Sequence, residues 1–155
     1  PALKAVIPIG PWGRALGLWD AEGMAGLAVP MLLMAGEVDD ISGYGDGMRR
    51  IFDEATGVPR WLLTFERAGH NAAAPIPAPV EASEPSPYLD FLPFDHYADP
   101  VWDSLRMNDI ARHFARPFLD RHLKGDSGAA AHLVPGNWPG FDAPPPGLRL
   151  EMKAP

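Results

Sequence analysis

The feature that most constrains the fold is an apolar run without a single charge, Val29 to Ala35 (VPMLLMA), which Gly36 ends. Successive side chains of a strand point to opposite faces of a sheet, so an uninterrupted apolar run is typical of a parallel strand covered on both faces. Pro30 lies at its start, where a missing hydrogen-bond donor matters least. The run therefore predicts a buried parallel strand, and with it a layered α/β fold.

Two further apolar runs extend this pattern, Leu3 to Ile9 (LKAVIPI) and Trp61 to Phe65 (WLLTF). Between the second and third strands, Met48 to Ala55 places apolar residues at helical spacing, which predicts a β-α-β unit with a right-handed crossover. A shorter helix is expected from Asp20 to Ala25. We thus expect about three parallel strands with flanking helices.

The rest of the chain is less regular. Residues 71–102 are rich in proline and are predicted to form a long loop or lid. Helical spacing returns from Asp103 to Leu123, with Asp103 as N-cap and with Pro117 expected to kink or split the helix near Phe114. We therefore expect residues 1–125 to form part of one domain, and residues 126–155 to form a Pro/Gly-rich surface tail with no clear element.

Composition excludes several classes of protein. The net charge is −7 and no run of basic residues occurs, which argues against a nucleic-acid or membrane surface. The apolar run Leu27 to Ala35 is far shorter than the roughly 20 residues of a membrane-spanning helix. The chain has no cysteine, which fits a soluble protein of the cytoplasm, the periplasm or the exterior and leaves the compartment open.

No cofactor or metal is expected. The glycine-rich segment Gly43 to Gly47 lacks the spacing of a dinucleotide-binding loop, because Met48 stands where glycine is needed. Asp95, His96 and Asp99 share no recognised ligand spacing. The other four histidines are expected to be solvated on the surface. His113 and His122 are expected on the polar side of a helix, and His96 and His132 in irregular segments.

The candidate catalytic residues lie at the ends of two predicted strands. Asp39 follows the second strand and His70 the third, and the carboxyl ends of neighbouring parallel strands are where open α/β sheets bind ligands. An aspartate that accepts a hydrogen bond from Nδ1 of histidine leaves Nε2 free to take a proton. Asp40 is expected to cap the following helix. Trp12 and Arg14 follow the first strand and are candidates to line a substrate pocket, the alternative being a loop aromatic and a solvated charge.

At these residues the chain resembles the C-terminal half of the α/β-hydrolase superfamily, and its dienelactone-hydrolase-like members in particular. The resemblance rests on VPMLLMAGEVD, which supplies Asp39, on WLLTFERAGH, which supplies His70, and on the helix RMNDIARHFARPFLDRHLKG. It implies an α/β-hydrolase fold in which Asp39 is the acid and His70 the histidine of a catalytic triad. The implied reaction is hydrolysis of a small-molecule ester or lactone.

The family's nucleophile is absent from these residues. The five serines, Ser42, Ser83, Ser86, Ser104 and Ser127, all lie outside a Gly-x-Ser-x-Gly motif. We therefore expect a chain that begins inside a longer polypeptide and is inert alone, with strand 3–9 pairing with a missing N-terminal half or a second copy. The alternative is a hydrolase-fold fragment or interaction module without catalysis.

Overall fold

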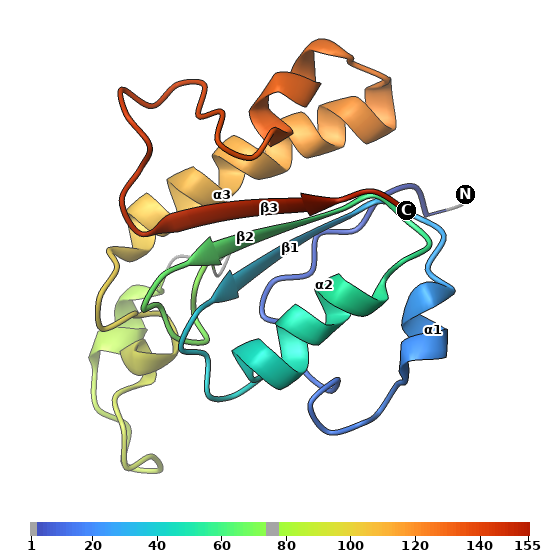
Figure 1. The fold of residues 1–155 in the computed structure, drawn as a ribbon. Helices are drawn as coiled ribbons and strands as arrows, with labels where there is room; N and C mark the ends of the chain where they lie inside the picture. The colour runs from blue at the N-terminus through green and yellow to red at the C-terminus, as the bar shows by residue number, and fades with distance from the viewer. Residues whose placement is uncertain (1–2, 74–77) are drawn as a thin grey trace.

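A mixed three-stranded sheet forms the centre of the computed structural model, which describes residues 3–73 and 78–155 (Figure 1). The strands are β1 (Met31–Gly36), β2 (Arg60–Phe65) and β3 (Leu148–Lys153), in the order β1-β2-β3. β1 and β2 are parallel, with Met31 opposite Arg60 and Gly36 opposite Phe65. The prediction of a mixed α/β class is thus confirmed, but the strands are not all parallel.

The expected first strand forms only in part. Residues 3–9 run parallel to β1 beside its free edge, through bridges from Val6 to Met31 and from Ile9 to Met34. The N–H of Val6 donates to Pro30, and the carbonyl of Pro8 accepts from Met34, both at 3.0 Å. Pro8 has no N–H to donate to β1, so the ladder is interrupted where the sequence predicted continuous pairing.

The backbone of residues 3–9 leaves one side unpaired. Ala5, Ile7 and Ile9 alternate with the residues bonded to β1, and their N–H and C=O groups make no hydrogen bond within the part of the chain that the structure describes. Apolar cavities of about 340 Å³, beside Ile7 and Ile9, and about 210 Å³, beside Val6 and Pro8, lie along this segment. This edge is therefore open to another strand.

β3 is a strand that the sequence analysis missed. Residues 126–155 were expected to have no clear element, yet β3 pairs antiparallel with β2, with Leu63 opposite Leu150. Its sequence, LRLEMK, alternates apolar and polar residues, and Leu148 and Leu150 are buried. Such alternation is typical of a strand with one face in the core and one in water.

Helices cover both faces of the sheet (Figure 1). On one face lie α1 (Ala21–Ala25) and a π-type turn (Tyr44–Arg49) that leads into α2 (Arg50–Glu54). On the other lie α3 (Ser104–Leu119), a π-type extension (Asp120–Lys124) and a 3₁₀ helix (Gly128–Leu133). Two hydrophobic cores result, one on each side.

The long helix begins at the predicted residue, but it is not split at Pro117 as the sequence predicted. The side chain of Asp103 accepts from the N–H of Arg106, which confirms the N-cap. Pro117 does not split α3 near Phe114, since the helix runs without a break from Ser104 to Leu119, and π-type geometry begins at Asp120. Phe114, Pro117 and Phe118 are buried, and Phe118 lies edge-on to Trp61 at 5.7 Å, so packing against the sheet holds this part of the helix together.

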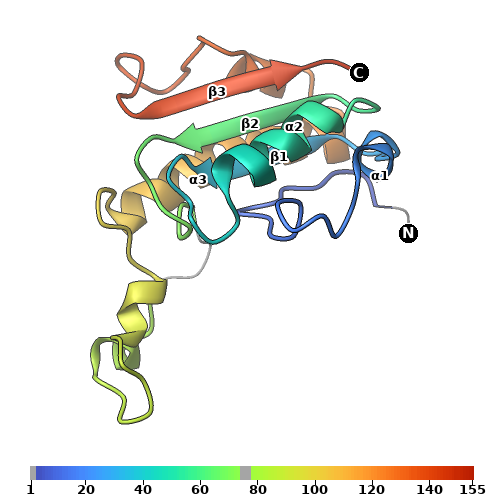
Figure 2. The ribbon, with the colours of Figure 1, turned by 60° about the horizontal axis from the view of Figure 1, so that its bottom comes forward.

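The loop predicted over residues 71–102 includes residues 74–77, which lie outside the described residues. Its described part contains two 3₁₀ turns, Val80–Ser83 and Pro93–His96, and extends away from the layers (Figure 2). Among the described residues no helix has the length and apolar character to cross a membrane.

Candidate active site

Asp39 and His70 meet at the carboxyl ends of the two parallel strands. Nδ1 of His70 lies 2.9 Å from Oδ2 of Asp39, which confirms the predicted contact. The side chain of Asp39 is fully buried, whereas that of His70 is 37% exposed. The pair therefore has a buried acceptor on one side of the imidazole and access to solvent on the other.

The second oxygen of Asp39 fixes the orientation of the carboxylate. Oδ1 accepts from the N–H groups of Ile41 at 2.9 Å and Ser42 at 2.8 Å. Asp39 thus caps the turn after β1 and binds the histidine with the same group. The expectation that Asp40 caps the following helix is wrong, because Asp40 is exposed and the N-cap position before the π-type turn is Gly43, which has no side chain to form a cap.

Ser42 is a site residue that the sequence analysis passed over. Its hydroxyl donates to the carbonyl of Gly10 at 2.9 Å and lies 3.4 Å from Nδ1 of His70. This position is on the side of the ring that Asp39 occupies, so Ser42 supports the pair and is not placed to attack a substrate beside Nε2. Nothing in the sequence around Ser42 marks it, since its partners come from other segments.

Close backbone packing brings the histidine turn to the end of β1. A Cβ on Gly36 would lie 2.0 Å from the carbonyl oxygen of Gly69, a distance that no side chain can occupy. Gly10, with φ of +52°, passes beside the ring, and a Cβ there would lie 3.3 Å from Cε1 of His70. Glycine at these positions is what lets the turn and the ring approach β1 and residues 3–10.

A loop segment far from the pair in sequence also binds the histidine turn. The N–H of Gly69 donates to Oδ2 of Asp99 at 2.7 Å, and Nδ2 of Asn71 donates to the carbonyls of Asp95 and Ala98. Asp99, considered above only as a metal ligand, is instead an acceptor for backbone N–H groups. In the described ranges no cluster of three or more His, Asp or Glu side chains could hold a metal ion.

Among the described residues, neither Trp12 nor Arg14 makes a hydrogen bond to Asp39 or His70. Trp12 lies on a loop and is 54% exposed. Arg14 is buried and binds both carboxylate oxygens of Glu54, at 2.7 and 2.8 Å, so it is not a solvated charge. This hydrogen-bonded pairing raises the pKa of Arg14 and lowers the pKa of Glu54.

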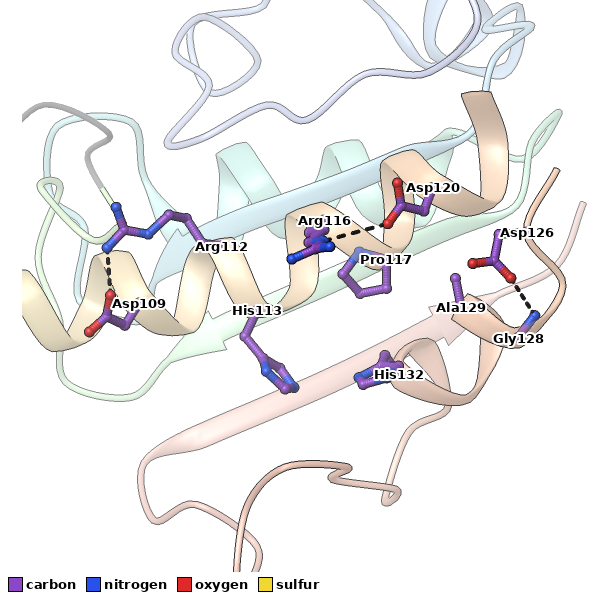
Figure 3. A pocket seen from close by; sticks show the side chains of 10 residues that line it. All are labelled: Asp109, Arg112, His113, Arg116, Pro117, Asp120, Asp126, Gly128, Ala129 and His132. Carbon is purple, nitrogen blue, oxygen red and sulfur yellow. Dashed lines mark hydrogen bonds and ion pairs between the residues drawn. The ribbon is translucent and has the colours of Figure 1, made fainter. Parts of the chain in front are cut away.

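Three of the remaining histidines are not solvated as expected. His113 packs against Phe141 and His132, and His122 packs against Trp61 and Phe118, all on one side of the sheet. Burial lowers the pKa of both His113 and His122, and the neighbouring His132 lowers that of His113 further. His113 and His132 share a cavity of about 610 Å³, shown in Figure 3, whose lining includes neither Asp39 nor His70.

The geometry defines what the pair can do chemically. A carboxylate can only accept, so in the neutral ring the contact favours the tautomer of His70 with the proton on Nδ1 and a lone pair on Nε2. Within the described part of the chain Nε2 makes no hydrogen bond, and His70 is therefore able to accept a proton from a group outside it.

The chain matches none of the known protein-family models and none of the curated proteins.

Proposed function

We propose that Asp39 and His70 are the acid and the general base of a serine hydrolase that acts on carboxylic esters or lactones. The observation that carries this proposal is the 2.9 Å contact from His70 to a fully buried carboxylate at the ends of two parallel strands. The resemblance to dienelactone-hydrolase-like proteins supports the same assignment.

In the proposed mechanism Nε2 of His70 takes the proton of a serine hydroxyl as that oxygen attacks the ester carbonyl. Asp39 holds the tautomer and stabilises the imidazolium that forms. The imidazolium then gives the proton to the leaving alkoxide, and the same cycle with water releases the acid. The serine belongs to a segment other than these 155 residues, since none of the five serines lies in the required motif.

A second candidate function, a non-catalytic interaction module with a hydrolase-like fold, is favoured by the position of Ser42. This is the serine whose hydroxyl contacts His70, and it lies against Nδ1 while donating to Gly10. Under this alternative the Asp39–His70 contact stabilises the fold and performs no proton transfer.

An activity assay on the polypeptide produced from its complete reading frame separates the two. The proposal predicts covalent labelling by a fluorophosphonate probe and hydrolysis of p-nitrophenyl esters or a simple lactone. His70→Ala and Asp39→Asn should lower kcat/KM by about three to four orders of magnitude, while Asp40→Asn should change it little. A polypeptide that neither reacts with the probe nor hydrolyses esters would refute the proposal and favour the interaction module.

A further inference from the structure

The turn that carries His70 has an unfavourable backbone on both sides of the histidine. Arg67 and Ala73 adopt φ values of 60° and 58°, in the left-handed region that non-glycine residues rarely occupy. Such conformations persist only where surrounding contacts hold them. The position of the imidazole therefore depends on bonds that the turn makes to other segments.

These bonds come from residues 95–102. The N–H of Gly69, directly before His70, donates to Oδ2 of Asp99 at 2.7 Å. The side chain of Asn71, directly after it, donates to the carbonyls of Asp95 and Ala98, both at 2.9 Å. His70 is thus bracketed by two neighbours that are bound to one short segment.

That segment is itself anchored. Oδ1 of Asp99 accepts from the N–H groups of Val101 and Trp102 at 2.9 and 2.8 Å, so the carboxylate binds three backbone donors. Nε1 of Trp102 donates to the carbonyl of Glu66 at 2.8 Å, and its ring lies edge-on to Phe65 at 5.4 Å. The segment is therefore fixed to the end of β2, from which the histidine turn departs.

We infer that Asp99 is a positioning residue for His70: its carboxylate holds the Gly69 N–H so that the imidazole stays aligned with Asp39. The carboxylate suits this task, because hydrogen bonds from N–H groups to a charged acceptor are the stronger kind. Without it the turn relaxes and Nδ1 moves away from Oδ2. Its importance for catalysis rests on the proposed function, whereas the alignment itself does not.

The test is the tautomeric state of His70 in the 155-residue chain, followed by ¹⁵N NMR with labelled histidine and assigned with His70→Gln. In the wild type, Nδ1 should resonate as a protonated nitrogen and Nε2 as an unprotonated one. Asp99→Ala should move both resonances towards the average of the two tautomers. It should also accelerate exchange of the Gly69 amide proton by about tenfold or more.

Asp95→Ala is the matched control, because it removes a carboxylate from the same segment while Asn71 binds only the backbone carbonyl of Asp95. It should leave the His70 resonances unchanged. Asp99→Asn, which keeps one acceptor oxygen, should shift them in the same direction as Asp99→Ala, and it decides the question if the alanine variant does not fold. His70 resonances that stay at wild-type positions in a folded Asp99 variant would overturn the inference.

The result is independent of turnover. If the Asp99 variants alter the tautomer of His70 but the wild-type polypeptide has no esterase activity, the hydrolase proposal is refuted and the positioning role of Asp99 stands. If the wild-type polypeptide is an active esterase but the Asp99 variants leave the tautomer unaltered, the positioning role is refuted and the hydrolase proposal stands.

Discussion

Replacing Asp39 with alanine removes the acceptor for three hydrogen bonds at once. Oδ2 accepts from His70, and Oδ1 accepts from the N–H groups of Ile41 and Ser42. The three donors differ in what they lose. His70 is 37% exposed and Ile41 60% exposed, so water can replace the carboxylate there. Ser42 is 1% exposed, and its N–H is left without a partner.

The expected loss in the free energy of unfolding follows from this difference. A buried donor without a partner costs about 1–3 kcal/mol, and a hydrogen bond to a charged group contributes about 1.5–3 kcal/mol net of exchange with water. Since two of the three sites can be rehydrated, we expect Asp39→Ala to destabilise the chain by about 3–4 kcal/mol. Asp40 is exposed and makes no hydrogen bond between described residues, so Asp40→Ala should change stability by no more than about 0.5 kcal/mol.

Urea denaturation followed by tryptophan fluorescence measures both variants against the wild type. Asp39→Asn gives an intermediate case: its oxygen can still accept from Ile41 and Ser42, but its NH₂ faces Nδ1 and forces the other tautomer of His70, for an expected loss of about 1–2 kcal/mol. Asp39→Ala and Asp40→Ala variants that agree within about 0.5 kcal/mol would show that the carboxylate does not hold the turn after β1.

Three further outcomes are expected. Gly36→Ala should destabilise the chain by more than about 3 kcal/mol, because its Cβ would lie 2.0 Å from the Gly69 carbonyl, whereas Gly45→Ala, with open space around it, should be tolerated; thermal melts compare them. Stability should fall as the pH drops below about 6.5, because partial burial lowers the pKa of His113 in the folded chain and the unfolded chain therefore binds a proton more readily. In urea titrations at about pH 7.5 and 5.5, His113→Gln should weaken this dependence, and the control His96→Gln, at an exposed histidine, should not. The open edge along residues 3–9 should pair with a second copy or another segment, and a monodisperse monomer with a sharp thermal transition in light scattering would contradict this.

Local patterns in the sequence were sufficient where one segment determines its own environment. The apolar runs identified β1 and β2, and the helical spacing from Asp103 to Leu123 identified the long helical segment that spans α3 and its π-type extension. Because parallel strands bring their carboxyl ends together, the positions after these strands also predicted the contact between Asp39 and His70. The same kind of pattern is present in LRLEMK, the sequence of β3, where apolar and polar residues alternate.

Tertiary structure alone decided which distant groups complete the site. Asp99 binds the turn of His70 from 30 residues away, and the hydroxyl of Ser42 donates to the carbonyl of Gly10 from 32 residues away. It also decided that Phe114 and Phe118 pack well enough to keep α3 continuous at Pro117, and that Pro8 interrupts pairing with β1. Sequence periodicity reports how a segment divides between core and solvent, whereas a hydrogen bond depends on the positions of two separate backbones. Those positions exist only once the layers have packed.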